Sequence, residues 1–414
     1  MSEGILVQVL YLDMNSYFAS VAQQLEPALR KRPVGIVTSL HERAACIAAS
    51  YEAKAKGVRV GTRMQEARQL CPGIVFRPAR HDIYVEMHSK IKAAVARVLP
   101  IAGVHSVDEV SCLLLGSEQQ LPRALQLAEA ARQSIYRHAG EALHCSIGLG
   151  TNRLLAKVAG ELHKPSGTDW LVPAVLPDKI LHLKLTDLPG ISRRMNARLN
   201  AAGVLDIASL YALPPRQARA IWHSVAGERF LRALRGESIP DPEAKPHSLG
   251  HSQVLSGYSR HPQQARLILR RLLVKAATRL RHGRFFATKL HISITNENYK
   301  RLHYGGKITA TQDSFTLLAH MESFWQGLAA QKLFSVGVVL GGLVSRENHI
   351  ADLFEERAFG ATTPRERLCA MLDALNQRYG RDTVCFGEQP KNMSPYSGAK
   401  IAFGRVPLKT EFRE

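Results

Sequence analysis

The chain has 414 residues, 45% of them hydrophobic, which is enough sequence for roughly two to four domains with cores of their own. No window is long and apolar enough to cross a membrane, and the first residues lack the basic segment that opens a secretory signal. We therefore expect a cytoplasmic protein with no membrane partner.

The net charge of +20 is unevenly distributed along the chain. Residues 1–171 carry 20 Lys and Arg against 15 Asp and Glu, whereas residues 172–346 carry 25 against 10. A basic middle segment beside a nearly neutral N-terminal segment indicates a polyanion-binding surface separate from the chemistry. The six cysteines form no CxxC pair, which argues against a zinc site or a disulfide framework.

Strand and helix patterns alternate in the first 171 residues, an order that fits an α+β sheet with helices on one face. Asn15 or Ser16 is a suitable cap for the first helix. The predicted strands are 4–13, 34–38, 44–49, 74–77, 104–107, 110–115 and 144–150. The predicted helices are 15–25, 51–56, 63–70, 82–99, 123–138 and 153–163.

A helical segment and a second α+β segment follow. Residues 176–236 have helical spacing and short loops, and three prolines mark a linker after them, at Pro240, Pro242 and Pro246. Residues 247–346 have the order β-α-β-β-α-β. Its predicted helices are 262–281 and 315–329, and its last strand is 334–344.

Three acidic residues occupy positions that suit a metal centre. Asp13 ends an apolar strand, and Asp108 and Glu109 lie between two strand-like runs. A carboxylate at a strand end and an acidic pair in a neighbouring hairpin can converge above one sheet. Mg²⁺ binds such oxygen ligands together with substrate phosphates. The alternatives are a helix cap for Asp13 and an exposed turn for the acidic pair.

The residues around these acids resemble the motifs of Y-family (translesion) DNA polymerases of the DinB/UmuC type. The matching segments, in the family's order, are YLDMNSYFASV (11–21), SYEAKAKGVRVG (50–61), HSVDEV (105–110), SIGLGTNRLLAKVA (146–159) with HKPSG (163–167), and LPGIS (188–192). Together they span about residues 11–210. The C-terminal segments 375–384 and 394–396 are similar to UmuC-like C-termini, and Asn15 and Lys54 also favour that branch.

The resemblance implies an α+β multidomain fold shaped like a right hand. A ferredoxin-like palm would comprise residues 1–15 and 80–171, and small fingers residues 16–79. A helical thumb with a helix-hairpin-helix would comprise residues 172–240, followed by an α+β little-finger domain at 247–346 and a C-terminal tail at 347–414. The implied function is template-directed translesion DNA synthesis by two-metal-ion nucleotidyl transfer, performed by a monomer on primer-template DNA and dNTPs.

The resemblance also implies roles for individual residues at the catalytic centre. Asp13, Asp108 and Glu109, with the backbone carbonyl of Met14, would hold two Mg²⁺ ions. Phe18 falls where the family places the aromatic ring that excludes a ribose 2′-oxygen; core packing is the alternative. Backbone N–H groups of residues 15–18 would help to bind the triphosphate. The other nucleotide-binding residues would be Tyr17, which packs beside Phe18, Tyr51, Lys54, Lys157 and Lys164.

Some of these positions depart from the family pattern. Ala48 stands where the family often has Ser or Thr, and Lys54 where it often has Arg. Lysine lacks the bidentate fork of arginine, so triphosphate binding is expected to be weaker there. A solvated helix face is the alternative for each lysine.

DNA and clamp contacts complete the implied set. Gly190 and Ser192 lie in the predicted hairpin, where the backbone can approach a phosphate. The basic residues of the helix at 266–284 would reach phosphates without regard to sequence, namely Arg266, Arg270, Arg271, Lys275, Arg279, Arg281 and Arg284. Residues 350–354 resemble a sliding-clamp peptide with Leu353 and Phe354 as anchors. Packing of these two side chains on a following helix is the alternative.

Two other functions remain open at this point. A catalytically inactive, polymerase-like DNA-binding subunit of a mutagenesis complex would share the fold, although such relatives typically lose the acids that this chain keeps. A nucleotide cyclase could pair carboxylates on a similar sheet, but it would not need the basic segment 172–346.

Overall fold

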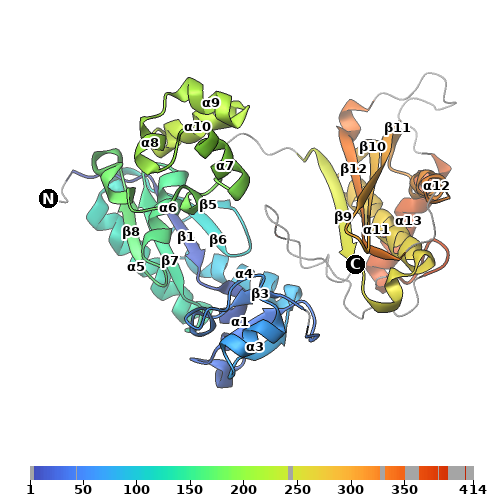
Figure 1. Cartoon of the computed structure of the whole chain (residues 1–414), viewed down its shortest axis with the longest axis horizontal. Helices are drawn as coiled ribbons and strands as arrows, with labels where there is room; N and C mark the ends of the chain where they lie inside the picture. Colours follow the sequence, from blue (N-terminus) through green and yellow to red (C-terminus); the bar gives the residue numbers. More distant parts are fainter. Residues whose placement is uncertain are drawn as a thin grey trace. The chain divides into compact units, whose positions relative to one another are not determined.

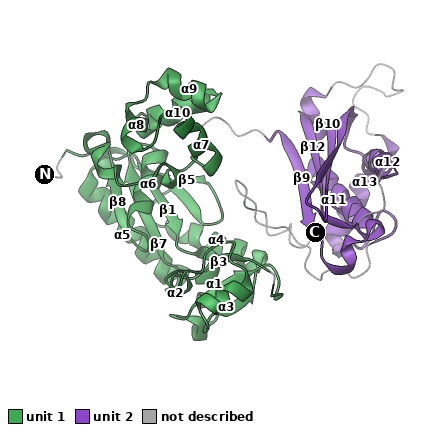
Figure 2. Ribbon diagram, viewed as in Figure 1, with its two compact units in different colours: residues 1–241, 399–409 green, residues 242–398, 410–414 purple. Residues whose placement is uncertain are grey.

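The computed structural model describes residues 4–42, 44–240, 246–326, 332–349, 363–380, 382–389 and 406. The chain divides into two compact units, with the boundary between residues 241 and 242 (Figure 2). The fold is mixed α and β, as predicted. No helix in the described part of the chain is long and apolar enough to span a membrane.

The first unit is built around a five-stranded sheet, the predicted palm, with the strand order β5-β6-β1-β7-β8 (Figure 1). Strand β1 is antiparallel to both β6 and β7, and β8 is parallel to β7. The strands are β1 (Val9–Met14), β5 (Ile101–Val104), β6 (Glu109–Leu113), β7 (Cys145–Gly150) and β8 (Thr168–Leu171). The helices on it are α4 (His81–Val95), α5 (Leu121–His138) and α6 (Arg153–Leu162).

Helices cover both faces of this sheet, which corrects the prediction of helices on one face. Because side chains alternate along a strand, Leu10 and Leu12 join the core beneath α4 and α5, whereas Val9 and Tyr11 face α6 through Ala156. Helix α6 can lie this close because Gly148 has no side chain. A Cβ atom at Gly148 would stand 1.8 Å from the Ala156 carbonyl oxygen.

The predicted fingers form a smaller layer with its own sheet. The order is β3-β2-β4, and β2 runs parallel to β4. Apolar side chains such as Val37, Ala53 and Met64 make a separate core there. The elements are α1 (Tyr17–Leu25), β2 (Val34–Val37), β3 (Cys46–Ala49), α2 (Tyr51–Lys54), α3 (Met64–Leu70) and β4 (Val75–Pro78).

The predicted thumb is helical and packs against α6 through a shared apolar core that includes Leu155, Leu199 and Leu231. Its helices are α7 (Arg193–Ala201), α8 (Ile207–Ala212), α9 (Pro215–Trp222) and α10 (Val225–Leu234).

The second unit has the predicted β-α-β-β-α-β order and a four-stranded sheet, β11-β10-β12-β9. Helices α11 and α12 cover one face, where Leu273 and Leu317 share a core with Leu290 and Val338. The elements are β9 (Ser248–Val254), α11 (Pro262–His282), β10 (Phe285–Asn296), β11 (Arg301–Thr311), α12 (Ser314–Trp325), β12 (Leu333–Ser345) and α13 (Pro364–Tyr379).

The predicted tail is in part a component of this second unit. Asp373 of α13 accepts hydrogen bonds from Thr278 and Arg281 of α11, at 2.8 and 2.6 Å. Phe386 packs edge-on against Phe315 of α12. The proposed clamp peptide at 350–354 lies outside the described residues and stays a prediction.

One local prediction in the palm is also corrected, whereas Ser16 is confirmed as one of the two predicted caps of the first helix. The strand predicted at 104–107 ends at Val104, because the Glu109 carbonyl accepts the His105 N–H and closes a hairpin turn there. Asp108 therefore lies in the turn, and Glu109 begins β6. Ser16 is the N-cap of α1, but it has a φ of 48° and its side chain makes no capping hydrogen bond.

Candidate active site

The three predicted catalytic acids come from two strands that pair directly. Asp13 of β1 is the register partner of Glu109 of β6, and Asp108 precedes Glu109 in the turn. Directly opposed residues of an antiparallel pair project from the same face, so both side chains lie on the side that α6 covers. The Asp108 carbonyl accepts the Met14 N–H at 2.9 Å, which ties the turn to the end of β1.

Two lysines from the α6 region bind these acids. Lys157 Nζ lies 2.5 Å from Glu109 Oε1, and Lys164 Nζ lies 3.0 Å from Asp13 Oδ1. Lys164 also contacts Glu161 at 2.5 Å. The sequence predicted that both lysines lie near the nucleotide. The structure shows that both contact the carboxylates. The alternation of side chains along a strand could not predict these contacts, because the lysines come from another part of the chain.

The acids have unequal proton affinities. Burial raises the pKa of Asp13 to about 7 against the opposing charge of Lys164, and burial with the charge of Glu109 raises the pKa of Asp108. Burial also acts on Glu109, but hydrogen bonds from Lys157 and Tyr11 outweigh it and lower the pKa of Glu109. Burial therefore makes ionisation of Asp13 and Asp108 unfavourable, whereas Glu109 is held in its ionised form.

The donor set suits a hard divalent cation. Among the described residues, no three His, Cys, Asp or Glu side chains are arranged to hold a metal ion as they stand. The lysine ammonium groups instead contact oxygens of Asp13 and Glu109. The raised pKa values of Asp13 and Asp108 reflect a penalty on ionisation that a bound cation would remove. Three carboxylates therefore fit Mg²⁺ once the lysines give way.

A set of aromatic side chains lies beside the acids, at the start of α1. The Phe18 ring stacks on Tyr84 with centroids 4.1 Å apart and an interplanar angle of 10°. Tyr17 is buried and its hydroxyl donates to the Tyr84 carbonyl at 2.6 Å, so it supports Phe18 from within the core. Phe18 itself is only partly buried and therefore keeps a face for a ligand.

The predicted triphosphate-binding residues of the fingers approach the same place. Lys54 Nζ lies 4.6 Å from the centre of the Tyr51 ring. Burial and the nearby charge of Lys164 lower the pKa of Lys54, so the two ammonium groups are close enough to repel each other. Ser16 Oγ is buried with no hydrogen-bond partner in the described structure. The two neighbouring ammonium groups are a suitable environment for phosphate oxygens.

Sequence reasoning missed several residues that shape this site. Tyr11 donates from its hydroxyl to Glu109 Oε2 at 2.9 Å, and Ser106 donates to Asp108 Oδ1. Asn15 donates to Ser146 at 3.0 Å and accepts the Ser166 N–H at 2.8 Å. Only Tyr11 had a usable signal, since it stands two positions before Asp13 and therefore on the same strand face.

The residues predicted to contact DNA fall into two groups, one in the hairpin before α7 and one on α11. Gly190 has a φ of 93°, and Ser192 caps α7 by accepting the Met195 N–H, which gives the hairpin and helix start that were expected. On α11, Arg266 and Arg270 instead bind Glu322 of α12, the first at 2.7 Å. Their DNA contacts stay a prediction, and these ion pairs argue against them.

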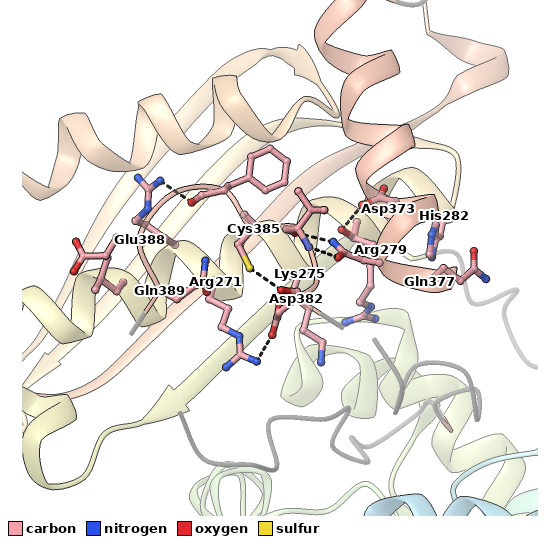
Figure 3. A pocket seen from close by; sticks show the side chains of 17 residues that line it. Arg271, Lys275, Arg279, His282, Asp373, Gln377, Asp382, Cys385, Glu388 and Gln389 are labelled. Carbon is pink, nitrogen blue, oxygen red and sulfur yellow. Dashed lines mark hydrogen bonds and ion pairs between the residues drawn. The ribbon is translucent and has the colours of Figure 1, made fainter. Parts of the chain in front are cut away.

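Three more of the predicted contacts on α11, namely Arg271, Lys275 and Arg279, line a pocket. It lies between α11 and the segment that contains α13 and residues 382–389, and its volume is about 100 Å³ (Figure 3). Arg271 binds Asp382 there at 2.8 Å, and Lys275 is part of the lining. A polyanion would have to compete with these internal acids.

Comparisons with known proteins show the family of the chain. Models of the impB/mucB/samB family and of its C-terminal domain match residues 12–161 and 246–353. DNA polymerase IV of Moorella thermoacetica is 32% identical over 392 residues, covering 91% of this chain and 94% of that protein. DNA polymerase IV of Pelotomaculum thermopropionicum is 28% identical over the same shares of the two chains.

The chain belongs to the Y-family of DNA polymerases. Among solved structures, a Y-family DNA polymerase chimera of Dbh and Dpo4 matches with a TM-score of 0.69 and 21% identity, over 82% of this chain and 99% of that one. The insertion ternary complex of Dbh DNA polymerase matches with a TM-score of 0.56 over the same shares. These two likenesses concern the fold. None of the comparisons tests the predicted lean of this Y-family polymerase toward the UmuC-like branch.

Proposed function

We propose that this Y-family polymerase performs translesion synthesis by adding dNTPs to a primer at a centre made of Asp13, Asp108 and Glu109. The observation that carries the assignment is the meeting of Asp13 and Glu109 across one strand pair, with Asp108 beside them. An inactive DNA-binding subunit would have no use for three clustered, partly buried carboxylates, two of which, Asp13 and Asp108, are costly to ionise.

Asp13, Asp108 and Glu109, with the Met14 carbonyl, would hold two Mg²⁺ ions, which when bound supply activation of the primer 3′-hydroxyl and neutralisation of the leaving pyrophosphate. The chain's own cations act on the incoming nucleotide. Lys164 and Lys54 lie near each other beside Asp13, so both can reach one triphosphate. Lys157 is held by its ion pair with Glu109 and contributes positive charge beside that carboxylate.

Sugar selection follows from the packing of Phe18. Its ring is held by the stack on Tyr84 and by an edge contact with His81 at a centroid distance of 6.0 Å. A ring fixed on two sides cannot turn away from a ribose 2′-oxygen, whereas a deoxyribose leaves room for it. Tyr17 contributes indirectly, through the hydrogen bond that fixes Tyr84.

DNA is bound, we infer, on the open face of the second unit's sheet. Lys289 pairs with Lys307 and Ser293 with His303, and these three basic side chains are exposed and alternate with buried Leu290 and Ile292. Arg301 lies further along on the same face. Cations on a sheet face that no helix of the described residues covers are better placed for phosphates than Arg266 and Arg270 of α11, which bind Glu322.

Primer extension on a defined template tests this function. Wild-type protein with Mg²⁺ should extend the primer and should also extend past an abasic site. Asp108→Ala should abolish nucleotide addition while retaining primer-template affinity, because the proposed DNA contacts lie in the other unit. Extension by Asp108→Ala at a near-normal rate would refute the catalytic assignment. A wild type that binds primer-template without extending it would favour the inactive-subunit alternative.

A further inference from the structure

Tyr11 is a buried tyrosine with a polar contact in the catalytic centre. It lies on β1 two residues before Asp13, and its side chain is only 1% exposed. The hydroxyl donates to Glu109 Oε2 at 2.9 Å. A buried hydroxyl is costly unless it is bonded, and here a carboxylate oxygen is the acceptor.

The Tyr11 ring is held on two sides. It stacks on His105 with centroids 5.3 Å apart and an interplanar angle of 16°, and Lys157 Nζ lies 5.4 Å from its centre. His105 in turn contacts Ser111 Oγ through Nε2 at 2.8 Å. The ring therefore has little freedom to turn, so its hydroxyl has a fixed position.

Each oxygen of Glu109 consequently has its own donor. Tyr11 binds Oε2, and Lys157 binds Oε1 at 2.5 Å. A lysine is a flexible point charge that can leave when another cation arrives, whereas the Tyr11 hydroxyl is attached to the strand that carries Asp13. The hydroxyl can therefore hold the direction of the Glu109 carboxylate after Lys157 has moved.

A tyrosine that served only to fill the core would not need a bonded hydroxyl. The small apolar cluster on this face contains Val9, Tyr11 and Ala156, and a phenylalanine ring would fill the same space without a hydroxyl to satisfy. The polar atom thus adds nothing to the packing, and its partner is a residue of the proposed metal centre.

We propose that Tyr11 is a positioning residue, which orients the Glu109 carboxylate for the metal and the nucleotide. The role rests on the proposed function, because it needs Glu109 as a ligand. Partners that orient a ligand in this way typically change metal affinity or activity by about 10- to 100-fold when removed.

Tyr11→Phe tests the role, since it deletes only the hydroxyl. Ser134→Ala is the matched control, because Ser134 is buried in the palm and donates to the Ala94 carbonyl at 2.7 Å on the other side of the sheet. For both variants we would measure kcat and the KM for dNTP in primer extension, the thermal midpoint, and Mn²⁺ binding to the protein alone by electron spin resonance.

Tyr11→Phe should lower kcat by about tenfold or more and weaken Mn²⁺ binding to a similar degree, with the KM for dNTP nearly unchanged. Ser134→Ala should leave kcat and Mn²⁺ binding as in wild type. His105→Leu, which removes the stacking partner but keeps the hydroxyl, should lower kcat to a smaller extent; it also serves as the second variant should Tyr11→Phe fail to fold.

Wild-type kcat and Mn²⁺ binding in Tyr11→Phe would overturn the proposal and make Tyr11 a packing residue. An equal loss of kcat in Ser134→Ala would also overturn it, because the effect would then be general destabilisation. Failure of the proposed function looks different: neither wild type nor variant would extend a primer, while the Mn²⁺ measurement would still report on the contact between Tyr11 and Glu109.

Discussion

Asp13 and Glu109, 96 positions apart in the chain, face each other across the antiparallel pair of β1 and β6. Burial makes ionisation of Asp13 unfavourable, and its pKa rises to about 7 even though Lys164 contacts it. Lys157 and Tyr11 act in the opposite direction on Glu109. Ionisation of Asp13 therefore reduces the stability of the metal-free fold, as buried charges in active sites commonly do.

The first prediction follows from the unfavourable ionisation of the buried Asp13 carboxyl. In the presence of a chelator at pH 8, Asp13→Asn should raise the thermal midpoint of the first unit above that of wild type. The folded-state pKa of Asp13 lies above its ordinary value, so wild type loses stability as the pH rises toward 7. An asparagine mimics the neutral acid, and the gain should shrink as the pH falls from 7 toward 4. The same variant should lose primer extension in Mg²⁺.

Differential scanning calorimetry at several pH values would measure the effect. A midpoint for Asp13→Asn below that of wild type at pH 8 would mean that the ion pair between Asp13 and Lys164 stabilises the fold more than burial of the charge destabilises it.

The second prediction concerns sugar selection. Phe18→Ala removes the ring that stacks on Tyr84, so ribonucleotide incorporation relative to dNTP should rise sharply. Tyr17→Phe is the contrast, because it deletes only the hydrogen bond to the Tyr84 carbonyl. That variant should lose about 1 kcal/mol of stability and shift the sugar preference much less than Phe18→Ala, because the Phe18 ring remains in place. Single-nucleotide incorporation with matched dNTP and rNTP would give the ratios, and an unchanged ratio in Phe18→Ala would assign Phe18 to core packing.

The third prediction separates two possible DNA-binding surfaces. The double variant Lys289→Gln/Lys307→Gln should weaken primer-template binding and reduce the log–log salt slope, by about 0.9 for each phosphate that the protein no longer neutralises. Arg266→Gln/Arg270→Gln should leave that slope unchanged and instead destabilise the second unit, because Glu322 would lose both partners.

Fluorescence anisotropy across a salt series measures both slopes. A reduced salt slope in Arg266→Gln/Arg270→Gln alone would show that DNA binds helix α11, as the sequence pattern predicted, and not the sheet face.

The fourth prediction concerns His88, whose Nδ1 lies 2.7 Å from the Val107 carbonyl beneath the acidic turn. Burial lowers the pKa of His88, so the folded state resists protonation and wild type should lose stability as the pH falls below about 6.5. His88→Asn keeps a donor to Val107 but does not titrate. Between pH 7 and pH 5.5, the protection of the amides of residues 105–110 against hydrogen exchange, relative to the intrinsic rate at each pH, should fall less in His88→Asn than in wild type. An equal loss of protection would show that His88 does not set the acid sensitivity of this turn.

The sequence by itself determined the elements and the family. The apolar run that ends at Asp13 and the helical spacing over 123–138 are local patterns, so β1 and α5 could be predicted, although the predicted strand at 4–13 began before the observed start at Val9. The motif residues Asp13, Asp108, Glu109, Phe18, Lys54 and Lys164 could be named as well, because their order along the chain resembles a known family. The family assignment was then confirmed by the matches over residues 12–161 and 246–353.

Only the tertiary structure decided which side chains meet. The register of β1 on β6 puts Asp13 opposite Glu109, and the glycines of β7 let α6 bring Lys157 to the carboxylate that Tyr11 of β1 also binds. The basic residues of α11 looked like a DNA-binding face in sequence, but α12 and the segment containing α13 place Glu322 and Asp382 against them. A charge pattern does not reveal which partner a side chain will bind, because that depends on elements distant in sequence packing on the same face.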